Sequence, residues 1–250
     1  MDMYNFPALD CHAHVAHDVT QAQVKSLEGA IIFAMTRSLN EFHAATSNRQ
    51  RGLVWAIGTH PANASSLNQW SGDRFRRLAK LSPIIGEVGL DRRGDLEAQA
   101  RIFREVLVNA GASLISVHST GRTREVINAL EKNSHPGVIL HWFLGNPQEV
   151  SRAAALGCFF SVNAAMSDAQ LTALPLDRVL PETDFPSSRT RTGARVPGDV
   201  RALEKTVARL TRKDVGEVRE LWYRNLRRLS LQAEVVHRLP LELADALERA

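Results

Sequence analysis

The stretch PIIGEV, residues 83–88, is a short apolar run that carries one acidic residue, Glu87, near its end. Short apolar runs bounded by turn residues are typical of β-strands that are buried on both faces. Seven further runs of this kind occur along the chain. The eight predicted strands are Ala8–Val15, Gly29–Met35, Gly52–Ile57, Pro83–Val88, Ala112–Val117, Gly137–Leu140, Gly157–Val162 and Asp177–Leu180.

Between these runs, apolar residues recur at helical spacing, as in Leu96, Ala100, Phe103 and Leu107. Strands that alternate with helices predict βαβ units and a parallel sheet. Eight such strands favour a (β/α)8 TIM barrel over the alternative, an open α/β sheet. We therefore expect one domain over residues 1–250.

The chain continues beyond the last predicted strand. A loop rich in Arg, Thr and Gly is expected over residues 187–198, followed by helices over residues 199–210 and 213–230. Residues 231–250 are also helix-like and are expected to form an extra C-terminal helix outside the barrel.

The composition excludes several classes of protein. With 44% hydrophobic and 23% charged residues in a chain of 250, the protein is neither disordered nor collagen-like. Only two cysteines, Cys11 and Cys158, indicate a reducing compartment, so we expect a cytoplasmic protein. No signal peptide is recognisable, and no apolar run approaches the roughly 20 residues that cross a bilayer. The net charge of +4 permits a polyanionic partner without establishing one.

Polar side chains lie at the ends of the predicted strands. In a barrel these ends surround one mouth, which is where catalytic groups lie. His12 and His14 end the first strand and, being two positions apart, point to the same side of it. Later strand ends supply His60, Glu87, His118, His141 and Asp184.

This set has the chemistry of a metal centre. Imidazole nitrogen and carboxylate oxygen suit Zn, Mn, Fe or Co, whereas Mg prefers an all-oxygen shell. The ends of the first, fourth, fifth, sixth and eighth strands supply four of these histidines and the two acids, which are too many ligands for one tetrahedral ion. Two ions about 3.5–4 Å apart would use them all, and such pairs hydrolyse phosphate esters and amides. The other histidines fit no such pattern and are expected to be structural: His17, His43, His135 and His237.

At these residues the chain resembles the TatD family of metal-dependent deoxyribonucleases, a branch of the amidohydrolase-like barrels. Six motifs stand in the family's order over nearly the whole chain. They are Asp10-Cys11-His12-Ala13-His14, Gly58-Thr59-His60-Pro61, Ile85–Asp91, Val117-His118-Ser119, His141–Gly145 and Pro181–Pro186.

The resemblance implies a role for each metal-compatible residue. His12, His14 and Asp184 would hold one divalent ion, His118 and His141 would hold a second, and Glu87 would bridge the two. The ions are expected to be Mg, Mn or Zn. Asp184 would also orient and deprotonate the attacking water. His60 would bind a phosphate oxygen or protonate the leaving oxygen, and Asp10 is expected to orient a ligand or a neighbouring polar group.

The rim of the predicted mouth departs from the family pattern. Arg92 and Arg93 stand where the family usually has an aromatic residue. With Arg122, Arg124, Arg189, Arg191 and Arg195 they make seven arginines that are expected to surround the mouth. Guanidinium groups match phosphate in a bidentate manner, so Arg92, Arg93, Arg122 and Arg189 are predicted to bind substrate. Trp142 is predicted to stack on a terminal base.

The resemblance implies hydrolysis of phosphodiester bonds in DNA, with nucleotides removed from a free 3′ end of a single strand. Two alternatives stay open at this point. The same barrel could serve a small-molecule amidohydrolase or phosphoesterase, or an inactive barrel could act as a subunit of a complex. Some relatives are encoded with anti-phage defence genes, which leaves other subunits open; no membrane partner is expected.

Overall fold

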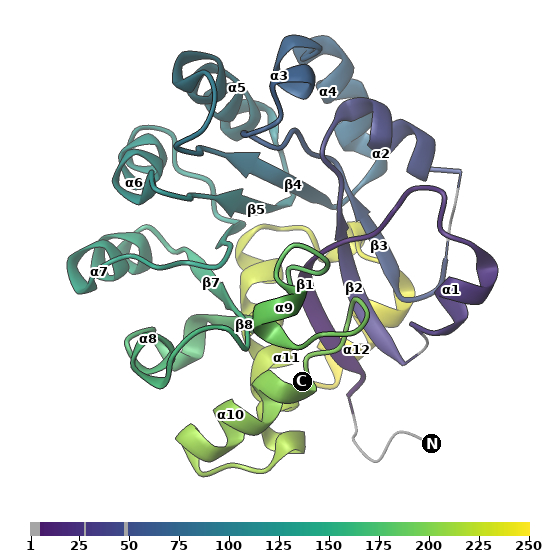
Figure 1. Ribbon diagram of the computed structural model, residues 1–250, viewed down its shortest axis with the longest axis vertical. Helices are drawn as coiled ribbons and strands as arrows, with labels where there is room; N and C mark the ends of the chain where they lie inside the picture. The colour runs from purple at the N-terminus through teal and green to yellow at the C-terminus, as the bar shows by residue number, and fades with distance from the viewer. Residues whose placement is uncertain (1–5, 28, 48–49) are drawn as a thin grey trace.

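The computed structural model describes residues 6–27, 29–47 and 50–250. Within them, all eight predicted strands are present and each paired strand runs parallel to its neighbour. They are β1 (Ala8–His14), β2 (Ala30–Met35), β3 (Leu53–Ala56), β4 (Ile84–Gly89), β5 (Leu114–His118), β6 (Val138–Leu140), β7 (Phe159–Val162) and β8 (Val179–Pro181). Figure 1 shows the strands at the centre of the molecule, with helices spread around them.

The strands form two sheets, β1-β2-β3 and β4-β5-β6-β7-β8. Hydrogen bonds link the sheets on both sides. The N–H of Gly86 donates to the carbonyl of Ile57 over 2.9 Å, and the N–H of Asp184 donates to the carbonyl of His12 over 2.9 Å. The strand ladder does not run continuously around all eight strands. The α/β fold with parallel strands is thus confirmed, whereas the closed barrel stays a prediction.

Asp10 supplies a side-chain link between β8 and β1. Its buried carboxylate accepts hydrogen bonds from the N–H and the hydroxyl of Thr183, over 2.9 and 2.6 Å. It also accepts from the N–H of Gly198 and of His12, over 2.8 and 3.2 Å. Burial raises the pKa of Asp10 to about 6 against the opposing effect of these bonds. One side chain therefore ties together the two strand ends that carry His12 and Asp184.

Helices cover the outer faces of the strands (Figure 1). Those that follow β1 to β4 are α1 (Gln21–Lys25), α2 (Leu39–Ala45), α3 (Ala64–Asn68), α4 (Gly72–Leu78) and α5 (Leu96–Asn109). Those that follow β5 to β7 are α6 (Thr123–Lys132), α7 (Pro147–Ala155) and α8 (Asp168–Thr172). α5 shows the general principle: Asp95 caps its first turn, and Phe103 and Val106 bury its inner face. Short 3-10 helices lie at Ala79–Leu81, Leu176–Arg178 and Val236–Arg238.

The chain after β8 is less regular than predicted. The expected loop over residues 187–198 contains the short helix α9 (Arg189–Thr192), and α10 (Arg201–Thr211) and α11 (Val215–Gln232) follow. The predicted C-terminal helix over residues 231–250 is interrupted, because Glu234 has a left-handed φ of 54° and Pro240 lacks the N–H that a continuous helix needs. Only α12 (Leu241–Glu248) and one 3-10 turn form there.

Within the described residues, no helix combines the length and the apolar character that crossing a membrane would require.

A buried ion pair holds α10 against α11. Arg219 Nε lies 2.7 Å from Glu204 Oε1, and a second guanidinium nitrogen donates to the carbonyl of Phe6 over 2.9 Å. Both side chains are buried. A buried charge needs its partner because removal of either one leaves the other desolvated without compensation. This pair therefore holds α10 and α11 together and links them to the residue that lies just before β1.

We predict that Glu204→Ala lowers the free energy of unfolding by about 3 kcal/mol, since it leaves the guanidinium of Arg219 buried without this carboxylate. Urea denaturation monitored by circular dichroism measures the effect. Glu220→Ala is the matched control, because Glu220 pairs with Arg224 at 3.8 Å on the exposed face of α11, the helix that carries Arg219. Its cost should stay within about 0.5 kcal/mol. Equal losses from the two variants would contradict this view of the ion pair.

Candidate metal centre

Glu87, at the end of β4, lies between two sets of histidines. Its Oε2 lies 3.3 Å from His14 Nε2 and 3.8 Å from His12 Nε2. Its Oε1 contacts His118 Nδ1 and lies 3.8 Å from His141 Nε2. The carboxylate is almost fully buried. The two oxygens of one side chain thus face different pairs of imidazoles.

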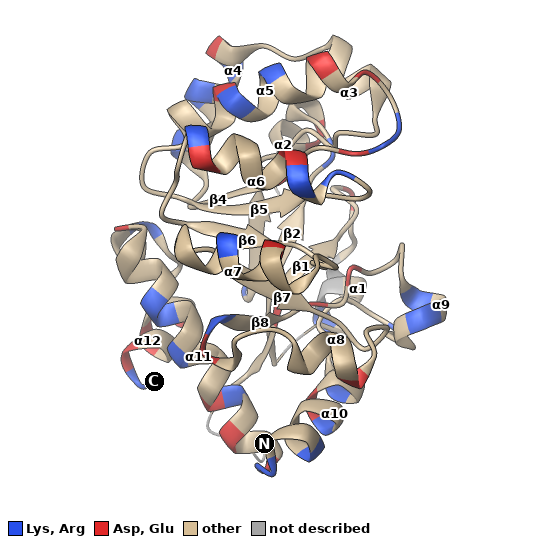
Figure 2. Cartoon of the chain, turned by 90° about the vertical axis from the view of Figure 1, so that its left-hand side faces the viewer, with Lys and Arg blue, Asp and Glu red and all other residues tan. Residues whose placement is uncertain are grey.

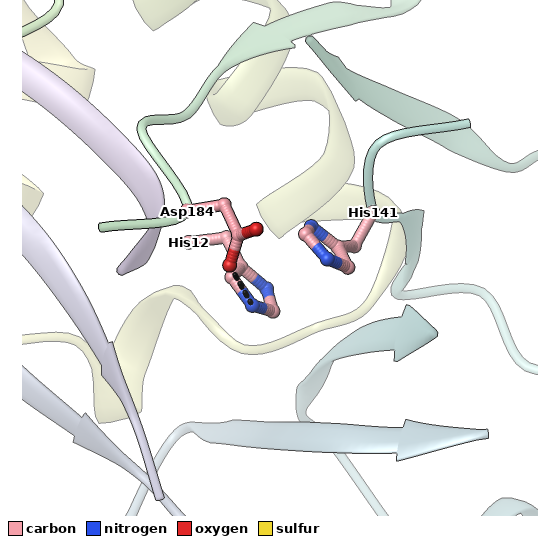
Figure 3. Close-up of side chains that lie close together, drawn as sticks. All are labelled: His12, His141 and Asp184. Atoms are coloured by element: carbon pink, nitrogen blue, oxygen red, sulfur yellow. Dashed lines mark ion pairs between the residues drawn. The ribbon is translucent and has the colours of Figure 1, made fainter. Parts of the chain in front are cut away.

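Asp184 completes the first of these sets from the end of β8. Its Oδ1 lies 3.7 Å from His14 Nε2 and 3.9 Å from His12 Nε2. Figure 3 shows its carboxylate directed at the His12 ring, with the His141 ring alongside. The His12 and His141 rings stack with centroids 3.6 Å apart. Asp184 has a φ of 47°, a left-handed conformation that costs energy for a non-glycine residue and is often retained at functional sites.

Three of the four histidines that were predicted as ligands have their far ring nitrogen occupied. His12 Nδ1 lies 2.7 Å from Ser116 Oγ. His118 Nε2 lies 2.8 Å from Asp91 Oδ2, and His141 Nδ1 lies 2.9 Å from Glu182 Oε2. Partners of this kind fix the tautomer and the orientation of a metal-binding imidazole. In each ring the other nitrogen faces the centre.

The residues present fit divalent ions. His12 Nε2, His14 Nδ1 and Glu87 Oε2 are buried without a hydrogen-bond partner among the described residues. Of these, His12 Nε2 and Glu87 Oε2 face the centre, where a bound ion would pair them, whereas the nitrogen of His14 that faces Glu87 and Asp184 is Nε2. Donor atoms about 2.1 Å from a tetrahedral ion lie roughly 3.4 Å from one another, and the separations from Glu87 and Asp184 to the imidazoles are close to this value. Nitrogen and carboxylate donors suit borderline divalent metals.

His60 differs from the other four histidines. Its Nδ1 accepts a hydrogen bond from the N–H of Ala62 over 3.0 Å, so Nε2 carries the proton in the neutral ring. That nitrogen lies 3.5 Å from Glu87 Oε2. Although His60 lies close enough to Glu87 and His118 to form a donor group with them, its hydrogen bond makes it a donor toward the cavity. Burial lowers its pKa, which favours this neutral form.

The carboxylates of the centre differ in their affinity for a proton. Burial opposes ionisation of Glu87, but the neighbouring histidines, His118 first, hold its pKa well below the ordinary value. Burial dominates at Asp184 and raises its pKa to about 6. Glu87 is therefore a permanent anion, whereas Asp184 can accept a proton near neutral pH.

Close backbone contacts explain two glycines of the motifs. A Cβ at Gly58 would lie 2.3 Å from the backbone nitrogen of Glu87. A Cβ at Gly89 would lie 2.2 Å from the carbonyl oxygen of His118, and the φ of Gly89 is 137°. Glycine at both positions lets β3 and β5 approach β4 closely enough to place Glu87 and His118 together.

The centre forms the floor of an open cavity of about 950 Å³. Of the residues predicted to bind substrate, His60, Arg92, Arg93 and Trp142 line this cavity. Arg191 lines it as well, and its guanidinium lies 4.3 Å from the centroid of the Trp142 ring. Figure 2 shows α9, which carries Arg191, projecting from the body of the molecule.

The other predicted rim arginines do not line this cavity. Arg122 pairs with Glu125 one turn along α6, over 2.8 Å. Arg189 begins α9, two positions before Arg191, so that it cannot face the same side of the helix. Arg124 and Arg195 are also absent from the lining. Charge at a strand end therefore did not suffice to place a side chain in the cavity.

Comparisons with known proteins agree with this geometry. The family model described as "TatD related DNase" matches residues 9–230. The chain belongs to the TatD family. It is 28% identical over 185 residues to a "3'-5' ssDNA/RNA exonuclease TatD" of Cronobacter turicensis, covering 67% of this chain and 70% of that protein. A protein of the same name from Pectobacterium carotovorum is 30% identical over 186 residues, covering 67% of this chain and 72% of that protein.

Solved structures support the same TatD fold. The TatD homologue YjjV of Escherichia coli superposes with a TM-score of 0.75 at 21% identity, covering 88% of this chain and 96% of that one. A TatD-family hydrolase of Entamoeba histolytica gives 0.73 at 17% identity, covering 90% and 98%. This chain is thus a TatD-family hydrolase with residues that could hold metal.

Sequence reasoning gave no role to four residues that complete this TatD site. Asp91 and Glu182 stand in the quoted motifs, a few positions from predicted ligands, and that proximity was an available signal. Ser116 lies two positions before His118 and shares its side of β5, which also could have indicated it. Arg37, after β2, lines the cavity, and no motif indicates it.

We predict that Glu182→Gln lowers the pKa of His141 in protein from which metal has been removed with a chelator. Burial disfavours charge on this ring, but Glu182 and the other nearby carboxylates outweigh it and raise its pKa to about 10. Because folding raises this pKa, the wild type should lose stability as the pH rises from about 6.5 towards 10, and the variant should lose less. NMR titration of the imidazole nitrogens measures the pKa. Titration of wild-type His141 near 6.5 would contradict the assignment.

Proposed function

We propose that this TatD-family chain is a two-metal nuclease that removes nucleotides from the 3′ end of single-stranded DNA. The observation that carries the proposal is Glu87, whose two oxygens face separate pairs of imidazoles on the floor of a cavity with arginines on its rim. We further propose that residues 1–250 form a single domain in which the two linked sheets are a (β/α)8 barrel. The two buried thiols, Cys11 and Cys158, support a cytoplasmic location.

The resemblance to the TatD family implies the division of the ligands, and the distances from Glu87 support it. His12, His14 and Asp184 would hold one ion, His118 and His141 the other, and Glu87 both. His141 stacks on His12, which is compatible with two adjacent ions. The ions, which we propose to be Mg, Mn or Zn, would lower the pKa of water towards about 7 and stabilise the charge on the phosphoryl oxygens.

The protein's own groups move the protons. Asp184, whose Oδ1 lies beside His12 and His14, would orient the attacking water and take its proton. His60 would donate its Nε2–H to a phosphate oxygen or to the leaving oxygen, because its Nδ1 is already bound to the backbone of Ala62. Glu87 would stay ionised and would serve as a shared anion rather than as a base.

The rim supports a polyanionic substrate. Arg37, Arg92 and Arg191 line the cavity and form no ion pair with another described residue, which leaves their guanidinium groups available to phosphate. Trp142 lies among them and would stack on an unpaired base, with Arg191 on the same platform. A base that stacks on a side chain must leave the double helix, which favours a single strand. The relatives are named ssDNA/RNA exonucleases, which makes RNA a second substrate to test.

We predict that Glu87→Ala abolishes nearly all turnover and the binding of both ions, because it removes the shared ligand. Arg92→Ala should keep both ions and should mainly raise KM for a labelled oligonucleotide. Metal content by mass spectrometry, together with kcat and KM, separates the two effects. If both variants lost turnover and metal equally, the division between metal floor and arginine rim would be wrong.

A panel of substrates tests the proposal directly. Labelled single-stranded DNA, duplex DNA and RNA, each with a free or a blocked 3′ end, are incubated with Mn or Mg and with chelator controls. We expect release of 3′-terminal nucleotides from single strands. KM should rise with salt, and a plot of log KM against log salt concentration should have a slope of about 0.7 for each phosphate contacted. Arg92→Ala should reduce that slope by about the amount that corresponds to one phosphate contact. No release from any polynucleotide would overturn the proposal.

The two alternatives predict different outcomes of the same panel. A small-molecule hydrolase would turn over small esters or amides with little salt dependence. The fold is compatible with this, since a probable 2-pyrone-4,6-dicarboxylic acid hydrolase of Acinetobacter baumannii shares it with a TM-score of 0.57 at 12% identity. An inactive subunit would turn over nothing and would bind no metal, which the buried donor set disfavours.

A further inference from the structure

Arg92 and Arg93 are neighbours in the sequence but have different surroundings. The Arg92 side chain passes over Gly121, where a Cβ would lie 3.1 Å from it, and forms no ion pair with another described residue. The guanidinium of Arg93 is paired with the carboxylate of Asp91: Nε lies 2.9 Å from Oδ1 and an Nη lies 2.7 Å from Oδ2. The backbone N–H of Arg93 donates to Oδ1 as well, over 2.8 Å. Two of the three guanidinium nitrogens of Arg93 are thus already bound.

Asp91 connects this arginine to the metal centre. The carboxylate is buried, although the side chain of Arg93 is 64% exposed. The same Oδ2 that contacts Arg93 accepts the Nε2–H of His118 over 2.8 Å. The opposite nitrogen of that ring, Nδ1, is directed at Glu87. A chain of four polar groups therefore runs from the rim to the carboxylate at the centre.

The geometry of this chain depends on the shape of the guanidinium group. A planar fork that bonds both oxygens of a carboxylate fixes its rotation, which a single point charge does not. Gln99 of α5 adds to this, because its side chain accepts the N–H of Asp91 over 2.8 Å and donates to the carbonyl of Arg93 over 2.6 Å. The Glu182 carboxylate, which contacts His141, is instead held by Ser161 and Asn163, both neutral. Of the two carboxylates on the far nitrogens of His118 and His141, only that of Asp91 is bonded by a cationic side chain among the described residues.

We propose that Arg93 is a positioning residue for metal binding rather than a phosphate ligand. It holds Asp91 in the orientation that turns His118 Nδ1 towards Glu87, and so it sets the affinity of the ion that His118 and His141 would share. This inference rests on the proposed two-metal centre. The inference gives different roles to two adjacent arginines that were both predicted to bind substrate. Arg92 would bind substrate, and Arg93 would affect the affinity for metal.

The test is a metal titration without substrate. Apo protein, prepared with a chelator and exchanged into clean buffer, is titrated with Mn²⁺ by isothermal calorimetry. We expect two ions in the wild type. Arg93→Gln should weaken one of them about 10- to 100-fold, as the loss of a group behind a ligand does, and should leave the other within twofold. Arg92→Gln, the matched control, removes the same charge one position away and should leave both affinities within twofold.

Two more variants keep the test independent of folding. Arg93→Lys retains the charge without the fork and should give an intermediate loss, and Asp91→Asn should equal Arg93→Gln. Circular dichroism identifies any variant that has unfolded. The activity of Arg93→Gln should recover when Mn²⁺ is raised in proportion to the lost affinity, with the salt slope of KM unchanged. A merely structural role would not give this recovery.

The outcomes separate this inference from the proposed function. If the wild type binds two ions and Arg93→Gln binds both as tightly, the positioning role is overturned and the nuclease proposal stands. If Arg92→Gln weakens an ion as much as Arg93→Gln, charge at the rim is responsible and the role is again overturned. If the wild type binds fewer than two ions, the two-metal centre fails and this inference fails with it.

Discussion

The whole site depends on one buried carboxylate that is surrounded by imidazoles. Glu87 has almost no contact with solvent, and its two oxygens face different pairs of rings. A buried anion is costly unless cations or hydrogen bonds compensate it, and here nitrogen donors lie near the separations that a shared metal ion imposes. The close approach of β3 and β5 to β4, the glycines that permit it and the acids behind the histidines all serve this arrangement.

The fold brings His12 and Asp184 together by bonds between the end of β1 and the residues that follow β8. β8 is short, and the groups that follow it reach β1 through the Asp10 carboxylate and through the backbone bond between Asp184 and His12. The proposed ligands lie in or directly after five strands spread along the sequence from β1 to β8, so no local segment carries the site. A change that loosens the junction of β8 with β1 would separate His12 from Asp184 while leaving both residues in the chain.

The sequence predicted the strands and the metal-compatible residues because both follow local rules. Apolar runs mark the strands, and the spacing of His12 and His14 places both on one face. The partners of the histidines, Asp91 and Glu182, depend on which groups face one another across neighbouring strands, which parity does not reveal. Of the predicted rim arginines, Arg92, Arg93 and Arg191 line the cavity, whereas Arg122 is paired with Glu125 and Arg189 lies on a different side of α9 from Arg191. The position of an arginine in the sequence does not show which group it pairs with, whereas the structure does.

The central claim is that two metal ions share Glu87. Anomalous diffraction from crystals grown with Mn²⁺ measures this directly. The account predicts two peaks about 3.5–4 Å apart, one on each side of the Glu87 carboxylate, with His12 and His14 at one peak and His118 at the other. A single peak, or two peaks of which only one contacts Glu87, would contradict it.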